Sequence, residues 1–307
     1  MERLKDPDRK KLFIFDGTAI VFRSYFALPQ HFTRKEGLPN NALRGILFSF
    51  SRFIANLSPT FALCVFDAGR VTFRNEIFPA YKANRDEPPF DLQQQFEWCP
   101  KICDALGIPV DERSGFEADD LIASYVIAYK DYFDDIYIIS QDKDLYQLVD
   151  SKVHLWNWPK DYPGYLEKLE EKYGFSPDRM ASFLALKGDS VDNIPGLPGI
   201  GDKSARILVS TFGKLDGIYE NIERLPTVKI RGAKRIQNSL QQHRELAYLY
   251  YQLTELKDDI PGLLNMDKLL CRGQNIKKLT AIAEKFEINI SIETLTRERF
   301  NNDLLQK

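Results

Sequence analysis

The stretch Leu-Phe-Ile-Phe-Asp at residues 12–16 decides the fold, because a short, continuous apolar run ends there on a carboxylate. Such a run is typical of a β-strand. The same arrangement returns where Ala-Leu-Cys-Val-Phe leads into Asp67, and where Ile-Tyr-Ile-Ile is soon followed by Asp142 and Asp144. In an open α/β sheet, ligands bind at the carboxyl ends of the strands. The three stretches therefore predict strands that bring their carboxylates to one edge of a sheet.

Strand-like and helix-like segments alternate up to about Trp158, as in βαβ crossovers over a mostly parallel central sheet with flanking helices. From Gly164 onward the periodicity is helical and is interrupted by glycine and proline. We therefore predict an α/β domain at 1–175 and a helical subdomain at 176–307. The charged end from Arg297 is expected to fray.

The composition is that of a globular chain, since its 307 residues are 44% hydrophobic and 28% charged. The 42 basic and 44 acidic residues give a formal charge of −2. Nine of the carboxylates lie at predicted strand ends, helix starts and loops. Setting these nine aside leaves an excess of seven cations, which predicts a basic surface around an acidic centre. Four cysteines without a CxxC pair indicate reduced thiols. With no signal-type or membrane-spanning run, we expect a cytoplasmic protein that does not contact a membrane.

Further acids lie where a helix begins and where a loop turns. Capping accounts for one or two of Glu117, Asp119 and Asp120 but not for all three, and Asp189 and Asp192 alone would pass for a loop. So many carboxylates repel one another unless cations lie between them, and Mg2+ takes oxygen ligands of this kind. We predict two or more Mg2+ or Mn2+ ions, held by Asp16, Asp67, Glu117, Asp119, Asp120, Asp142, Asp144, Asp189 and Asp192.

A basic and aromatic strip follows Asp67. It combines Arg70, Arg74, Lys82 and Arg85 with Phe73, Phe78 and Tyr81. At helical spacing, positions 74, 78, 81 and 85 share one face, although Pro79 interrupts it. A solvated surface is the alternative, but beside a carboxylate site cations can bind phosphates while rings stack on unpaired bases. We expect a helical arch over the site near 70–100.

Three glycines fall within the run Gly-Leu-Pro-Gly-Ile-Gly-Asp-Lys-Ser at 196–204. A helix rather than a strand is expected before it, and lysine does not follow the last glycine directly, so neither a Rossmann turn nor a P-loop fits. The remaining interpretation is a helix-hairpin-helix near 188–212 that holds duplex DNA through its phosphates. Arg231 and Lys234, with Arg235, give a second contact or a solvated helix face. The expected DNA-binding residues are Arg70, Arg74, Tyr81, Gly196, Gly199, Gly201, Lys203, Ser204, Arg231 and Lys234.

Together these motifs resemble the 5′-nuclease domain of bacterial DNA polymerase I, a relative of the flap endonucleases. The resemblance runs in consistent order from about Leu12 to Leu256. It rests on Asp16-Gly17-Thr18, Val65-Phe66-Asp67, Phe73-Arg74, Tyr81-Lys82 with Arg85, Glu117-Ala118-Asp119-Asp120, Asp142-Lys143-Asp144-Leu145, Gly188-Asp189 with Asp192-Asn193, and Gly196 to Lys203.

The resemblance implies a metal-dependent 5′-3′ exonuclease or flap endonuclease that acts in DNA replication and repair. Its substrates would be DNA with 5′ flaps, nicks or ends, including RNA-primed strands. It also implies that the acids from Asp16 to Asp120 form one metal group and the other four a second, and that a potassium ion binds at the hairpin. The family places basic residues like Arg23, Lys82 and Arg85 near the scissile phosphate. We expect a monomer associated with the nucleoid.

Two other functions stay open. A non-catalytic protein that binds branched DNA would keep the hairpin and the arch, but here no carboxylate of the set has been neutralised. A PIN-type ribonuclease shares the acids at strand ends, but it gives no reason for the hairpin or for the long helical second half. His31, His154 and His243 lie in no motif and are expected in the core or at the surface.

Overall fold

The structure is a computed structural model that describes residues 2–28 and 39–289, so the expectations for His31 and for the end from Arg297 lie outside it. A five-stranded sheet has the order β3-β2-β1-β4-β5, and every neighbouring pair is parallel. The predicted mostly parallel sheet is confirmed. Its strands are β1 (Lys11–Asp16), β2 (Phe61–Thr72), β3 (Val110–Gly115), β4 (Asp135–Ile139) and β5 (Val153–Trp156).

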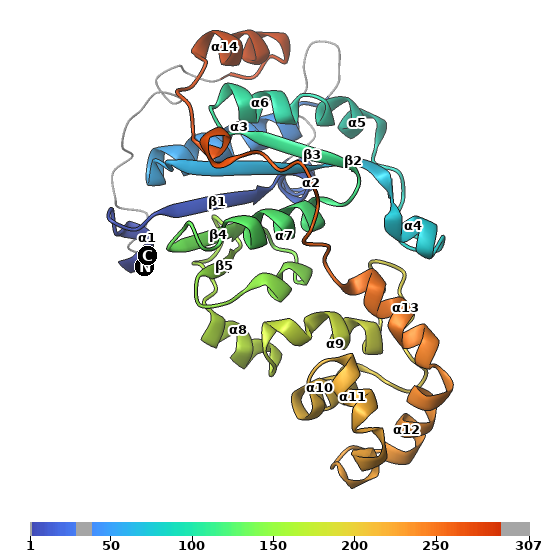
Figure 1. The fold of residues 1–307 in the computed structure, drawn as a ribbon. Coiled ribbons are helices and arrows are strands. Elements are labelled where there is room, and N and C mark those ends of the chain that lie inside the picture. The colour runs from blue at the N-terminus through green and yellow to red at the C-terminus, as the bar shows by residue number, and fades with distance from the viewer. Residues whose placement is uncertain (1, 29–38, 290–307) are drawn as a thin grey trace.

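Helices cover both faces of the sheet (Figure 1). Phe13 and Phe15 of β1 pack in one layer, whereas Leu12 and Ile14 pack in the other. Successive strand residues point to opposite faces, so an apolar run of this kind needs cover on both. The first layer holds α2 (Gly17–Ala27), α3 (Asn41–Leu57) and α6 (Cys99–Ala105), and α7 (Ala118–Tyr129) lies in the second.

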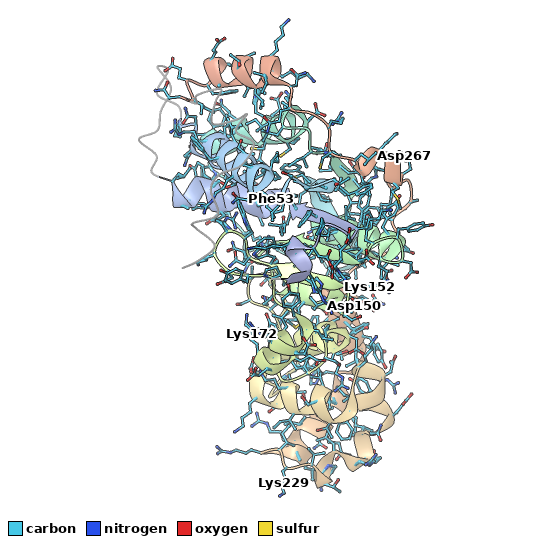
Figure 2. The ribbon with its side chains drawn as sticks, turned by 90° about the vertical axis from the view of Figure 1, so that its left-hand side faces the viewer. Phe53, Asp150, Lys152, Lys172, Lys229 and Asp267 are labelled. Carbon is cyan, nitrogen blue, oxygen red and sulfur yellow. The ribbon has the colours of Figure 1, made fainter. Side chains whose placement is uncertain are left out.

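A helical part extends below the sheet, with Lys229 at its far tip in Figure 2. It has its own core, which includes Phe183, Leu208, Ile218 and Leu240. Its helices are α8 (Leu166–Tyr173), α9 (Met180–Lys187), α10 (Asp202–Phe212), α11 (Leu215–Glu220), α12 (Ala233–Gln242) and α13 (Arg244–Thr254).

After α13 the chain returns to the sheet part. The amide of Cys271 donates to the carbonyl of Thr60, and α14 (Ile276–Lys285) packs against α6. The predicted division assigned all of 176–307 to the helical subdomain, whereas the segment after α13 packs on the sheet part. The remaining α-helices of the described residues are the short α1 (Glu2–Lys5), α4 (Phe73–Ile77) and α5 (Phe90–Phe96), and short 3-10 helices lie at Asp144–Leu148, Pro177–Arg179, Ile222–Thr227 and Met266–Leu269. No helix among the described residues is long and apolar enough to span a membrane.

Candidate metal and DNA-binding site

The carboxyl edge of the sheet brings several of the predicted acids together. Asp16 ends β1, and its side chain accepts hydrogen bonds from the amide of Ala19 at 2.9 Å and the hydroxyl of Ser140 at 2.8 Å. Asp67 lies on β2 and accepts from the amide of Ala118, in the first turn of α7, at 2.7 Å. These bonds tie Asp16 and Asp67 to the N-termini of α2 and α7, which favour negative charge, and they tie Ser140, just after β4, to Asp16.

A glycine allows the turn after Asp16. A Cβ atom on Gly17 would lie 2.7 Å from the ring of Phe66 and 2.8 Å from the sulfur of Cys64. Real Cβ atoms do not approach heavy atoms so closely, so a larger residue would push α2 away from the sheet. Gly17 therefore holds α2 and its cap, Asp16, close to β2.

Electrostatic strain marks this edge of the sheet. Burial, with the nearby charges of Asp67 and Asp142, raises the pKa of Asp16 to about 7. Burial and the same carboxylate of Asp142 raise the pKa of Asp144 to about 7, and the pKa of Asp119 lies well above its ordinary range for the same reasons. In addition, Oδ1 of Asp144 is buried without a hydrogen-bond partner. Oxygen atoms in this state fit a divalent cation.

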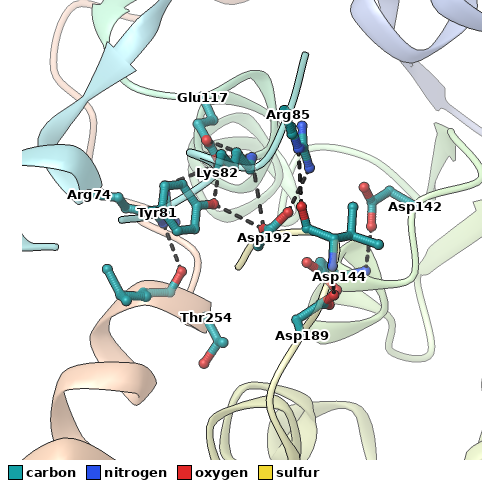
Figure 3. Close-up of polar contacts among 12 residues, drawn as sticks. Arg74, Tyr81, Lys82, Arg85, Glu117, Asp142, Asp144, Asp189, Asp192 and Thr254 are labelled. Atoms are coloured by element: carbon teal, nitrogen blue, oxygen red, sulfur yellow. Dashed lines mark hydrogen bonds and ion pairs between the residues drawn. The ribbon is translucent and has the colours of Figure 1, made fainter. Parts of the chain in front are cut away.

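Lysine and arginine side chains already neutralise part of the acidic set (Figure 3). Lys82 lies 2.6 Å from Glu117 and 3.9 Å from Asp192. Arg85 lies 2.6 Å from the other oxygen of Asp192. Burial by itself would lower the pKa of Lys82, but the charges of Glu117 and Asp192 raise it above its ordinary value. The two cations predicted to act on the phosphate are therefore next to the acids.

These cations, which pair with Glu117 and Asp192, account for part of a negative finding. Within residues 2–28 and 39–289, no group of three or more His, Cys, Asp or Glu residues is arranged so that it could hold one metal ion. Carboxylates that are paired with ammonium or guanidinium groups face those groups instead of a shared centre. The metal site stays a prediction, and it requires these ion pairs to rearrange.

Arg74 and Asp120 have a different role from the one predicted. Their side chains are 2% and 0% exposed, and they form two hydrogen bonds of 2.6 and 2.7 Å. Arg74 also donates to the carbonyls of Leu253 and Glu255, while Asp120 accepts from the amides of Glu117 and Lys257. Arg74 is thus buried away from DNA, and the oxygens of Asp120 are already bonded within the protein.

Tyr81 is also buried, with 3% exposure, so its ring is not free to stack on a base. Its hydroxyl lies 3.1 Å from both Glu117 and Asp192. The segment around it is not one helix, because α4 ends at Ile77 and turns follow through Arg85. The shared helical face expected for positions 74 to 85 is therefore wrong. Pro79, which cannot continue a hydrogen-bonded helix, lies at the break.

The other basic candidates lie around the edge of the site. Arg23 donates to the carbonyl of Trp158 at 2.8 Å, and burial lowers its pKa against the raising effect of Asp16. Arg70 is about half exposed, forms an ion pair with Glu87 and donates to the carbonyl of Arg85. Arg23 thus lies near Asp16, and Arg70 lies beside Arg85 of the basic strip.

The predicted hairpin is a loop that joins α9 to α10. Gly196 is buried at a φ of +70°, and a Cβ atom there would lie 2.4 Å from the amide nitrogen of Gly188. Its role is thus close backbone packing, not contact with DNA. Gly199, Gly201, Lys203, Arg231 and Lys234 are exposed, and Ser204 is half-buried.

Sequence reasoning missed three side chains at the site. Thr18 accepts a hydrogen bond from the amide of Asp67, Ser140 donates to Asp16, and Lys143 lies 2.5 Å from Asp189. Lys143 was visible as a cation between two acids. The hydroxyls gave no signal, since their partners are 49 and 124 residues away in the chain.

The comparisons with known proteins identify the family. The family model described as the 5′-3′ exonuclease N-terminal resolvase-like domain matches residues 11–174, and the one described as the 5′-3′ exonuclease C-terminal SAM fold matches 175–277. Fold and site thus define a nuclease with a parallel α/β domain and a helical second domain. The chain belongs to the 5′-3′ exonuclease family, and the resemblance seen in the motifs is confirmed.

Two relatives show different lengths. The 5′-3′ exonuclease of Buchnera aphidicola subsp. Schizaphis graminum is 34% identical over 92% of this chain and 98% of its own length. DNA polymerase I of Rhizobium leguminosarum is 36% identical over 96% of this chain, which spans 28% of that protein. Among solved structures, T5 5′-exonuclease with bound zinc has a TM-score of 0.66 at 23% identity, covering 93% of this chain and 96% of that one. The catalytic core of Rad2 in complex with DNA substrate has a TM-score of 0.61 at 16% identity, covering 93% and 90%.

Proposed function

We propose that the chain is a metal-dependent 5′-3′ exonuclease and flap endonuclease, which hydrolyses phosphodiester bonds at junctions of single-stranded and duplex DNA. The observation that carries the proposal is the gathering of acids at the carboxyl edge, where burial and the nearby charge of Asp142 raise the pKa values of Asp16, Asp119 and Asp144. A protein that only binds DNA has no need of such an unfavourable cluster.

The donor set suits Mg2+ or Mn2+, since the groups are carboxylates and one buried oxygen of Asp144 has no hydrogen-bond partner. We assign one ion to Asp16, Asp67, Glu117 and Asp119, and a second to Asp142, Asp144, Asp189 and Asp192. When bound, such ions supply an activated water and neutralise phosphate charge. Asp120 is better assigned as the anchor of Arg74.

Lys82, Arg85 and Arg23 would hold the scissile phosphate. Lys82 and Arg85 are already beside the acids and need only exchange a carboxylate partner for a phosphate. Their charges oppose the negative charge that grows on phosphorus in the transition state, so they favour that state over the bound substrate. The proposed products carry 5′-phosphate and 3′-hydroxyl ends.

The helical part would hold the duplex. The exposed Gly199, Gly201 and Lys203 lie at the start of α10, where free amides favour phosphate, and Arg231 and Lys234 supply further cations. Arg70 would contact the single strand, and Ser204 would add a phosphate contact. A potassium ion would bind at the hairpin. We further propose a monomer that acts on flaps, nicks and RNA-primed ends at the cytoplasmic nucleoid.

The test compares three labelled substrates at one low salt concentration, with Mg2+ or with EDTA: a 5′-flap DNA, a nicked DNA and a linear RNA. The variants are Asp67→Ala and Asp142→Ala, and the control is Asp178→Ala, whose carboxylate is exposed in the helical part. We expect Mg2+-dependent cleavage of the flap that both site variants lose and the control keeps. Full activity in the site variants would refute the proposal. If the wild type binds the flap DNA but does not cleave it, the chain is a DNA-binding protein. If the wild type cleaves the linear RNA in preference to the flap, it is a ribonuclease.

A further inference from the structure

Lys143 lies inside the second acidic group. It separates Asp142 from Asp144 in the sequence, just before the short 3-10 helix Asp144–Leu148. Its ammonium is 2.5 Å from Oδ2 of Asp189 and 3.8 Å from Oδ1 of Asp144. The second of these oxygens is the buried one without a hydrogen-bond partner. One ammonium group thus lies between two carboxylates from different parts of the fold.

This position is the one that a cation shared by Asp144 and Asp189 would take. Two positive charges in direct contact repel each other strongly near a protein surface, where the effective dielectric constant is well below that of water. An ammonium and a divalent ion therefore cannot both remain between the same two oxygens. One of them has to leave.

The structure also provides a place for the ammonium to go. The side chain of Lys143 is 38% exposed, while those of Asp189 and Asp144 are 6% and 20% exposed. It borders a hollow of about 730 Å3 that Lys187, Ser190 and Asp202 also line. A flexible four-carbon side chain can turn into such a hollow without moving the backbone.

We propose that Lys143 is a built-in competitor of the second metal ion: its ammonium holds Asp144 and Asp189 together until an ion displaces it into the hollow. The inference rests on the proposed function, because it takes these two acids as metal ligands. Lys143 is thus a positioning residue. It stabilises the metal-free site and lowers the affinity of that site for metal.

The experiment titrates Mn2+ into the DNA-free full chain by calorimetry and measures thermal unfolding in EDTA. The variants are Lys143→Met, which keeps the length and removes the charge, and Lys143→Arg, which keeps the charge. Lys187→Met is the matched control, because Lys187 borders the same hollow but its ammonium lies over the ring of Phe183, 5.2 Å from the centroid. We expect Lys143→Met to bind the weaker Mn2+ ion about tenfold more tightly and to unfold at a lower temperature in EDTA. Lys143→Arg should resemble the wild type, and Lys187→Met should change Mn2+ affinity far less than Lys143→Met, because Lys187 acts on Asp189 only through its charge.

A double variant guards against simple misfolding. Lys143→Met with Asp189→Asn removes both charges, so it should regain stability in EDTA and lose the gain in Mn2+ affinity. Unchanged or weaker Mn2+ binding in a folded Lys143→Met variant would overturn the inference while the proposed function stands. If the wild type takes up no Mn2+ at all, the proposed metal site itself fails, and the inference fails with it.

Discussion

Arg74 and Asp120 face each other in the interior with opposite charges, and each has further backbone partners. Removing the guanidinium of Arg74 leaves a buried carboxylate without its counter-ion, so we expect Arg74→Ala to lower the free energy of unfolding by about 3–5 kcal/mol. Arg70→Ala is the control, since its side chain is 46% exposed and should change stability by less than about 1 kcal/mol. Urea unfolding of both variants measures the difference, and equal effects would contradict the structural role of Arg74.

Lys82 lies against Glu117 and Asp192, beside the proposed position of the scissile phosphate. Because its charge matters more as negative charge grows, Lys82→Ala should lower kcat about 100-fold or more and change KM little. The control is Lys101→Ala, whose exposed ammonium pairs with Glu97. Steady-state cleavage of a 5′ flap separates the two constants. A rise in KM alone would make Lys82 a group that only binds substrate.

Most of the acids could be predicted to lie together because each follows a local signal, the end of an apolar run or the start of a helix, whereas Asp189 and Asp192 lie in a loop. The partners could not. The bond between Arg74 and Asp120 joins residues 46 apart, and that between Tyr81 and Asp192 joins residues 111 apart. Composition around Arg74 and Tyr81 gave the same signal as an exposed basic strip. Burial, which decides between the two interpretations, depends on the whole fold.

Among the strands, β1, β2 and β4 were predicted because each contains a continuous apolar run. β3 was missed because Val-Asp-Glu-Arg-Ser-Gly is largely polar, as suits a strand at the edge of the sheet. β5 was missed because it has four residues and lies at the other edge. Edge strands need less apolar surface, so the periodic signal that reveals central strands is weak in them.

The loop between α9 and α10 depends on Gly196, whose φ of +70° and contact with Gly188 exclude a side chain. Gly196→Ala should therefore destabilise the protein by about 1–3 kcal/mol and weaken binding to duplex DNA. Gly273→Ala is the matched control, because a Cβ atom there meets nothing within 4 Å and the residue lies outside the loop between α9 and α10. Thermal unfolding and a DNA-binding titration measure both effects. If the two variants lose the same stability, close backbone packing is not what Gly196 provides.

At the scale of the whole molecule, the site joins the two parts of the chain. Asp189 and Asp192 come from the loop after α9, while the other acids come from the sheet part. The amide of Lys82 donates to the carbonyl of Asp192, and the side chain of Asn193 donates to the carbonyl of Ala80. The second metal group therefore depends on how the helical part docks against the sheet part.

This crowding of charge makes the stability of the metal-free protein depend on pH. Burial is the main reason why the pKa values of Asp16 and Asp144 are raised to about 7, so their contribution to stability is present below the unfolded pKa near 3.8 and is lost as the pH rises through about 7. In EDTA, we expect each of these two groups to lower the free energy of unfolding by about 1.4 kcal/mol per pH unit between pH 5 and 7. Burial lowers the pKa of His154, so this residue makes stability rise with pH. The wild type is therefore compared with Asp144→Asn, which keeps His154 and should show a flatter dependence of stability on pH. Thermal unfolding should also show that Mg2+ stabilises the wild type more at pH 8 than at pH 5. If the wild type and Asp144→Asn have the same pH dependence of stability in EDTA, Asp144 is not a source of this strain.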